Sequence, residues 1–322
     1  MVVALSRQGP AGILIGCAAD AVLADPRRAH PVAGFGLLAT ALERFMYRDS
    51  RVYGALYASV LVTGLAAAGA LAQRGARNGL ARTAITAAAT WVALGGTTLV
   101  RTGSSIADLL DAGDIDGARA VLPSLCGRDP AVLDGPGLTR AAVESVAENT
   151  SDAQVAPLLW AAIGGAPAVL AYRGINTLDA MVGHRSDRYR RFGWAAARLD
   201  DVANFAAARL TAALVTLCAP VVGGSASGAI RAWRRDAARH PSPNAGVTEA
   251  AFAGALGLQL GGPTQYRHEL EIRPTLGDGR RPEVGDLRRA VRLSRAVQIS
   301  AVAVASAVSA VGRSGRPVSP RL

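Results

Sequence analysis

The feature that most constrains this chain is a run of 21 residues, 52–72, that contains no charged side chain. About 20 consecutive apolar residues are enough to cross the hydrocarbon core of a bilayer as an α-helix. A second uncharged run covers residues 83–100. The whole chain is only 18% charged, whereas soluble domains average about 25%. These observations predict an all-α fold: a polytopic integral membrane helical bundle with helical polar loops, located in the cell membrane.

Four other apolar stretches are shorter or interrupted: residues 10–24, 155–172, 210–224 and 296–312. For these, buried helices of a soluble bundle are an alternative explanation. The polar blocks that separate the stretches are predicted to be helical insertions near residues 101–154, 172–204 and 225–295. We predict one membrane-embedded domain that covers residues 1–322. In the first block, Gly113 is expected to end one helix and Asp114 to cap the next.

The first apolar stretch could also belong to a signal peptide. Arg7 precedes it, and the segment LIGC, which ends at Cys17, resembles a lipobox. Asp20 and the segment DPRRAHP follow at once, and they have the character of mature sequence. An unprocessed N-terminus is therefore favoured, and a processed one is the alternative.

The basic residues narrow the choice of partners. The net charge is +11, and all 35 basic residues are arginines, since the sequence contains no lysine. A P-loop lysine, a Schiff-base lysine and a lysine general base are therefore excluded. Arginine suits carboxylates and phosphates. Aromatic residues make up only 5% of the chain, too few for a stacking surface, so we expect a lipid bilayer and an anionic small molecule as partners and no nucleic acid.

Three carboxylates are spaced four residues apart in the segment RAAVESVAENTSD. Glu144, Glu148 and Asp152 would share one face of a helix, with Asn149 beside them. Like charges at this spacing repel each other unless a cation lies among them. A Mg²⁺ ion would be satisfied by one or two of these carboxylates together with substrate phosphates. A solvated acidic face is the alternative.

Carboxylates, amides and arginines also gather beside the stretches 155–172 and 210–224. They are Arg173, Asn176, Asp179, Arg198, Asp200, Asp201, Asn204 and Arg209. Polar groups beside apolar segments are costly to bury unless they bind something. They therefore predict ligand binding, and a surface network of arginines and aspartates is the alternative.

Two further segments combine polar residues with turns. Asp25 and His30 bracket two arginines in the segment DPRRAHP. Asn244 is a predicted N-cap with Glu249 near the helix start. The glycine-rich segment GALGLQLGG could approach phosphates, but a helix C-terminus followed by a turn is the preferred reading. No stretch shows a convincing strand alternation, so no strand is predicted.

Taken together, these motifs resemble the CobD/CbiB family of cobalamin biosynthesis, the adenosylcobinamide-phosphate synthases. The matching segments are DAVLADPRRAHPV, GRDP, RAAVESVAENTSD, APLLWAAIGGAPAVLAYRGINTLDAMVGH, FGWAAARLDDVANFAAARLTA and HPSPNAGVTEAAFAGALGLQLGG. They run nearly from end to end. Departures such as Ala24, Ala153 and Gln154, where the family usually has Gly and Gly-Val, remove no carboxylate.

The resemblance implies a membrane enzyme that converts (adenosyl)cobyric acid to cobinamide (phosphate). It would form an amide between a corrin propionate and aminopropanol or its O-phosphate, driven by ATP with Mg²⁺. A carboxylate is a poor electrophile and must be activated, most simply as an acyl phosphate. That step needs a metal, positive charge on the phosphates and a base for the amine. Other late cobalamin-pathway membrane enzymes are further expected partners, with which the protein would form a complex.

The needs of this reaction and the chemistry of the candidate residues together predict their roles. The catalytic group is expected to be Glu144, Glu148 and Asp152, as metal ligands or general bases, with His30 as a proton carrier. The second candidates for metal binding are Asp179, Asp200 and Asp201. The residues expected to contact phosphate, carboxylate or other substrate groups are Asp25, Asn149, Arg173, Asn176, Arg198, Asn204, Arg209 and Asn244.

Two other functions compete with this one. An Asp-rich membrane prenyl- or phosphotransferase would need two Asp-rich repeats, and the segment DDVAN supplies only part of one. A small-molecule transporter would also carry polar residues within the membrane.

We predict that Glu148→Gln abolishes amide formation while the protein accumulates normally, because glutamine keeps the shape of Glu148 and removes its charge. Product formation by membranes that contain equal amounts of variant and wild type measures this. Near-normal activity of the variant would show that the three carboxylates form a solvated helix face without a catalytic role.

Overall fold

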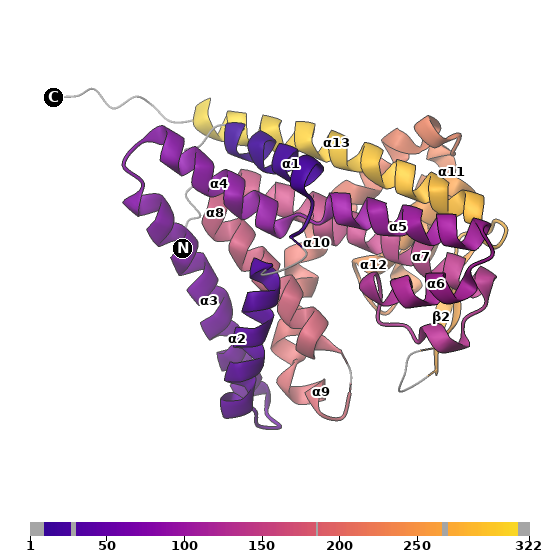
Figure 1. Cartoon of the computed structure of the whole chain (residues 1–322), viewed down its shortest axis with the longest axis horizontal. Coiled ribbons are helices and arrows are strands. Elements are labelled where there is room, and N and C mark those ends of the chain that lie inside the picture. The colour runs from indigo at the N-terminus through magenta and orange to yellow at the C-terminus, as the bar shows by residue number, and fades with distance from the viewer. Residues whose placement is uncertain (1–9, 27–29, 185, 266–269, 315–322) are drawn as a thin grey trace. The chain divides into compact units, whose positions relative to one another are not determined.

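The computed structural model describes residues 10–26, 30–184, 186–265 and 270–314 of the 322-residue chain. Most of them are helical, which confirms the all-α prediction (Figure 1). The α-helices are α1 (Ala11–Leu23), α2 (Pro31–Met46), α3 (Arg51–Gly75), α4 (Gly79–Ala93), α5 (Gly96–Asp111), α6 (Ile115–Val121), α7 (Gly135–Thr150), α8 (Ala156–Leu178), α9 (Tyr189–Phe192), α10 (Trp194–Cys218), α11 (Ala226–Asp236), α12 (Ala245–Leu256) and α13 (Val284–Ser314). Two π-helical turns, Ser151–Val155 and Asp179–Gly183, precede and follow α8.

A β-hairpin corrects the prediction that the chain has no strand. It pairs β1 (Leu260–Gln265) with β2 (Leu270–Leu276) in antiparallel fashion, and a bulge lies between Leu260 and Gly262. Gly261 and Gly262 have φ angles of +83° and +87°, and a side chain at Gly261 would collide with the carbonyl of Pro274. Glycines and prolines thus interrupt the alternation that would have revealed the strands. The preceding helix ends at Gly257 in a left-handed conformation, as the glycine-rich segment predicted.

The chain divides into two compact units. Unit 1 contains the described residues of Met1–Gly95, Ala156–Ala203 and Ala301–Leu322, and unit 2 contains those of Gly96–Val155 and Asn204–Ser300. Helices α10 and α13 contribute residues to both units. The prediction that residues 1–322 act as one membrane-embedded domain stays a prediction.

Unit 1 is held together by close helix contacts. Helix α8 packs against α3 and α4, and α1 lies along α4 (Figure 1). Tyr57, Leu178 and Phe192 belong to one buried apolar cluster. A Cβ at Gly69 would lie 2.8 Å from Pro167, so the absence of a side chain lets α3 approach α8. Small residues at helix contacts are typical of membrane bundles.

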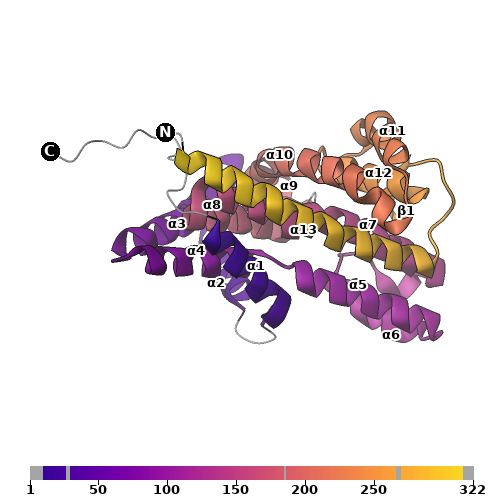
Figure 2. The same ribbon diagram turned by 90° about the horizontal axis from the view of Figure 1, so that it is seen from above.

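Unit 2 contains the predicted helical hairpin and a second close helix pair. Gly113 adopts a φ of +76° after α5, and the side chain of Asp114 accepts a hydrogen bond from the Gly117 N–H at the start of α6. Helices α11 and α12 lie side by side (Figure 2). A side chain at Gly228 would collide with the backbone of Gly254, and the reverse also holds. These two glycines therefore bring the helix backbones into direct contact.

Five helical segments in the described part of the chain are long and apolar enough to cross a membrane: Arg51–Gly75, Gly79–Asp111, Gly135–Gly183, Trp194–Val222 and Val284–Val311. They are compatible with a multi-pass membrane protein. The apolar stretch 10–24 forms the 13-residue α1, which is shorter than a typical span. The predicted interruption of the stretch 155–172 is confirmed at Gly165, where φ is 65° and ψ is −151°.

We expect the protein to stay in the membrane fraction after washing with alkaline carbonate, because the outward-facing apolar side chains of these segments need lipid around them. Immunoblotting of pellet and supernatant measures this, with a peripheral membrane protein as the control that is released. Recovery of the protein in the carbonate supernatant would contradict a multi-pass arrangement.

Candidate active site

A buried ion pair anchors the polar centre of unit 2. Glu144 on α7 pairs with Arg128, and their side chains are 2% and 5% exposed. The second oxygen of Glu144, Oε1, accepts a hydrogen bond of 2.7 Å from the Gly261 N–H. A buried carboxylate is costly unless it is paired and hydrogen-bonded, and here both oxygens have partners. Glu144 is thus held in one position by two distant parts of the chain.

Arg140 holds the same glycine segment from one helical turn earlier. Its Nη1 donates to the carbonyl of Gly261 at 2.7 Å, and its Nη2 donates to the carbonyl of Pro263 at 2.6 Å. Residues four apart lie on the same face of a helix, so Arg140 and Glu144 both form hydrogen bonds to the start of β1. The hairpin is therefore fixed against α7.

Glu249 on α12 is the least compensated group of this centre. Its side chain is 1% exposed, and neither carboxylate oxygen has a hydrogen-bond partner among the described residues. Its Oε1 lies 3.8 Å from Nη1 of Arg273 and 3.9 Å from Nε2 of His240, too far for hydrogen bonds. Burial, together with the negative charges of Glu144 and Glu148, raises the pKa of Glu249 well above its usual range.

His240 and Arg273 are each oriented by a further contact. Nδ1 of His240 lies 3.0 Å from the amide nitrogen of Ser242 and 3.2 Å from its carbonyl oxygen, and Nε2 faces Glu249. Burial and the positive charge of Arg273 lower the pKa of His240 and favour the neutral ring. Arg273 donates from Nε to Glu271 at 3.3 Å. One cation and one neutral imidazole thus face the Glu249 carboxyl.

The predicted acidic stripe begins on α7 and runs into the π-helical turn that follows it. Glu148 is half-buried, and Arg273, Arg128 and Glu144 act on it electrostatically. Asp152 lies beyond the end of α7, in the π-helical turn Ser151–Val155. A π-helical turn changes the phase of the helix, so the regular four-residue spacing ends before Asp152. Their catalytic roles stay predictions.

Asn149 is engaged within its own helix. Its amide nitrogen donates to the carbonyl of Ser145 at 2.9 Å and to its hydroxyl at 3.1 Å. The amide nitrogen is therefore occupied, and substrate binding by Asn149 stays a prediction.

Arg209 and Asn244 order the loop that carries His240. Nη1 of Arg209 donates to Oδ1 of Asn244 at 2.7 Å, and Nη2 donates to the carbonyl of Pro243 at 3.1 Å. Asn244 occupies the N-cap position of α12, as predicted, but its side chain makes no capping hydrogen bond. The N-cap position is thus confirmed, and the side-chain oxygen of Asn244 is bonded to Arg209 instead of to the helix backbone. Asn204 is buried in the same unit.

Other predicted residues form a polar chain in unit 1. Nη1 of Arg173 donates to Oδ1 of Asn176 at 3.4 Å, and Nδ2 of Asn176 donates to Oδ1 of Asp200 at 3.3 Å. Arg198 pairs with Asp201 at 3.1 Å on the helix surface. Consecutive residues of a helix are about 100° apart, so Asp200 and Asp201 contact different partners.

The predicted metal ligands do not form a recognisable metal site. Asp179 lies in the π-helical turn Asp179–Gly183, and Asp200 and Asp201 lie on α10. Within the described ranges, no group of three or more His, Cys, Asp or Glu side chains is arranged to hold a metal ion. Their metal role stays a prediction.

Asp25 and His30 are brought together in unit 1. Nε2 of His30 lies 3.3 Å from Oδ1 of Asp25, and Nδ1 accepts a hydrogen bond of 3.1 Å from the Val32 N–H at the start of α2. The ring is thus an N-cap and half of a carboxylate–imidazole pair. Such a pair orients the imidazole ring, which is compatible with a proton carrier. The proton-carrier role of His30 stays a prediction.

The comparison with known proteins decides the family. The family model described as CobD/Cbib protein matches residues 13–294. The chain belongs to the CobD/CbiB family. This confirms the expectation drawn from the motifs and supports a role in cobalamin biosynthesis.

Similar proteins from several bacteria carry the description "Cobalamin biosynthesis protein CobD". The protein from Mycobacterium tuberculosis (strain ATCC 25618 / H37Rv) is 66% identical over 294 residues, which cover 91% of this chain and 94% of that protein. The one from Geobacter metallireducens is 44% identical over 299 residues, with the same coverage of both chains. The one from Chromobacterium violaceum is 41% identical over 284 residues, covering 85% of this chain and 88% of that protein. No solved structure matches the chain.

Several residues of this candidate site have no predicted role in the sequence analysis above. They are Arg128, Arg140, His240, Glu249 and Arg273. One signal was available: α12 reads AGVTEAAFAGAL, so Glu249 is its sole charge. A lone charge in an otherwise apolar helix is a functional candidate when the helix is buried all round. The arginines gave no such signal, since 35 basic residues are spread along the chain.

We predict that Arg128→Met strongly destabilises the fold, because it leaves Glu144 buried without its cation. Breaking a buried pair by removing one partner costs about 3–5 kcal/mol. The control is Arg191→Met, which breaks an exposed pair with Asp49 and should cost at most about 1 kcal/mol. Thermal unfolding of the detergent-purified variants measures both. Equal melting temperatures of the two variants would show that the buried pair is not needed for folding.

Proposed function

We propose that this CobD/CbiB family member is an ATP-dependent acid–amine ligase, an adenosylcobinamide-phosphate synthase. It would join a corrin propionate of (adenosyl)cobyric acid to aminopropanol or its O-phosphate. The observation that carries the proposal is the buried carboxyl of Glu249, which has no hydrogen-bond partner among the described residues and faces Arg273 and His240. Family membership supports the pathway, and this centre supplies groups that amide formation needs.

The proposed chemistry begins with activation of the corrin carboxylate. Attack of the carboxylate on the terminal phosphate of ATP gives an acyl phosphate and ADP. The amine nitrogen then attacks the acyl carbon, the carbon–oxygen bond to phosphate breaks, and inorganic phosphate leaves. Arg273 would bind the carboxylate or phosphate oxygens in this scheme, because a guanidinium matches their geometry.

The amine must lose protons during this reaction, and Glu249 is the proposed acceptor. A general base works best when its pKa is close to the working pH. An ordinary carboxylate is too weak a base for an amine, and the raised pKa of Glu249 moves it toward that range.

Mg²⁺ would enter with the nucleotide and neutralise phosphate charge. It commonly uses only one or two protein carboxylates together with phosphates, so the absence of a three-ligand cluster among the described residues is compatible with it. Glu148, which is half-buried beside Glu144, is the carboxylate that we propose for this contact. The enzyme would work in the cell membrane, in a complex with other late cobalamin-pathway enzymes.

Both competing functions are less well supported. The Asp-rich transferase needs two aspartates that share a metal, but Asp200 is bonded to Asn176 and Asp201 is paired with Arg198. A transporter would not consume ATP in proportion to cobyric acid and amine. Product analysis therefore separates all three functions.

The deciding experiment is mass spectrometry of the products formed by purified full-length protein with cobyric acid, ATP, Mg²⁺ and each amine separately. We expect a product whose mass is the sum of cobyric acid and amine minus water.

The variant Glu249→Gln should lower the rate by at least about 100-fold, the usual contribution of a general base, without lowering the melting temperature. In wild type the rate should rise with pH through the pKa of Glu249, because the base accepts a proton only when deprotonated.

The matched control is Glu283→Gln, which changes an exposed glutamate and should keep the full rate. Absence of an ATP-dependent product with every amine would contradict the ligase proposal. A normal rate of Glu249→Gln would leave the ligase intact and remove Glu249 from its mechanism.

A further inference from the structure

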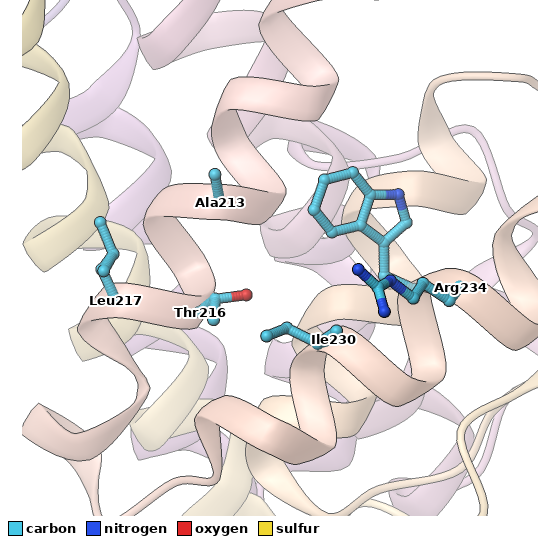
Figure 3. Close-up of a pocket in the computed structure, with 6 residues that line it drawn as sticks. Ala213, Thr216, Leu217, Ile230 and Arg234 are labelled. Atoms are coloured by element: carbon cyan, nitrogen blue, oxygen red, sulfur yellow. The ribbon is translucent and has the colours of Figure 1, made fainter.

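A pocket outside the candidate active site lies between α10 and α11 in unit 2. Its volume is about 410 Å³, within the range of roughly 300–1,000 Å³ that is typical of small-molecule sites. The lining residues are Ala213, Thr216, Leu217, Ile230, Trp233 and Arg234. Figure 3 shows Ala213, Thr216 and Leu217 on one helix and Ile230 and Arg234 on the next. The pocket is therefore an apolar groove with one cation.

The α10 side of the pocket belongs to a candidate membrane span. Helix α10 is part of the segment Trp194–Val222, which is long and apolar enough to cross a bilayer. Leu217 in the pocket and Val221 beyond it are each 73% exposed. Such side chains on a spanning helix face lipid chains, so the groove opens toward the bilayer.

The α11 side has the character of a helix at the membrane surface. Gly228, Ala229 and Ala232 are buried, whereas Arg231 and Arg234 are exposed. Trp233 follows Ala232 and is half-buried. A basic, strongly amphipathic helix with a tryptophan is typical of the interface between headgroups and acyl chains. The long arginine side chains can reach phosphates from there.

The charges of α11 single out Arg234. Arg235 is engaged by Asp236 and Asp278, each at 2.8 Å. Arg231 donates to the hydroxyl of Ser227 at 3.1 Å. Arg234 has no acidic partner among the described residues, although it lines the pocket. A guanidinium at the edge of an apolar groove is complementary to a phosphate that carries an acyl chain.

We propose that this pocket binds an anionic phospholipid, with an acyl chain against Ala213, Leu217 and Ile230 and the lipid phosphate on Arg234. The site is independent of the proposed ligase reaction, because none of its residues belongs to the cluster around Glu249. The lipid would fill the groove and neutralise Arg234 at the same time.

The test is native mass spectrometry of the full-length protein in detergent, titrated with phosphatidylglycerol, phosphatidylcholine or inorganic phosphate. Wild type should bind one phosphatidylglycerol per chain with preference over phosphatidylcholine, and phosphate should not displace it. Arg234→Gln should weaken phosphatidylglycerol binding at least about tenfold, because the variant loses a charge-assisted hydrogen bond to the phosphate. Ala213→Trp should abolish it by filling the groove. Arg190→Gln, at an exposed arginine of α9, is the control and should bind as wild type.

Three results would overturn the proposal. Equal binding of both lipids, unchanged by Arg234→Gln, would show non-specific lipid retention. Displacement by inorganic phosphate would show a phosphate site without a lipid. A dimer that Ala213→Trp converts to monomer would show that a second copy of the chain covers the groove. If Ala213→Trp fails to fold, Arg234→Gln still decides between these results and the expected one.

Discussion

The cost of burying charge in an apolar helical protein governs the arrangement of unit 2. Glu144 is tolerable inside because Arg128 takes one of its oxygens and the Gly261 N–H takes the other. Each partner comes from a different part of the chain, so satisfying one carboxylate fixes the segment before α7 and the start of the β-hairpin at the same time. Arg140 adds two bonds to the same hairpin. The hairpin in turn carries Arg273, which lies opposite Glu249. The position of the cation opposite the proposed base thus depends on the ion pair between Glu144 and Arg128. The predicted catalytic role of Glu144 stays a prediction.

Glu249 is a buried carboxyl whose cost of burial is not offset by hydrogen bonds. It is as deeply buried as Glu144, yet it has no hydrogen-bond partner among the described residues. A folded protein would gain stability by replacing such a group with an apolar one of similar shape. Its retention beside a cation and an imidazole is easier to understand if the cost is offset by a use for the carboxyl. Of the two buried glutamates, Glu144 has partners for both oxygens and Glu249 has none among the described residues, which is why Glu249 is the proposed base.

Features that depend on neighbouring residues were predictable from the sequence, and features that depend on distant residues were not. The long apolar helices, the break near Gly165 and the turn at Gly113 and Asp114 follow from local composition. The hairpin is not predicted from the sequence because Gly261, Gly262, Pro263 and Pro274 interrupt its alternation.

The candidate site was harder to predict than the fold. The acidic stripe is predicted to continue to Asp152, but the π-helical turn Ser151–Val155 ends the regular spacing. The bond between Glu144 and Gly261 joins residues 117 positions apart, a pairing that no local pattern encodes. The family was recognisable because its motifs extend along most of the chain, whereas the roles of single residues require their partners in space.

The contact between Gly228 and Gly254 has a mechanical consequence for the two faces of α11. Where side chains separate two helices, they can change rotamer and absorb a small movement. Here backbone meets backbone, and a close-packed interface of this kind transmits displacement instead of absorbing it. The outer residues of α11 can therefore vary in charge and size without disturbing α12, as long as α11 stays in place. If α11 itself shifts, α12 must move with it, and Glu249 is carried along.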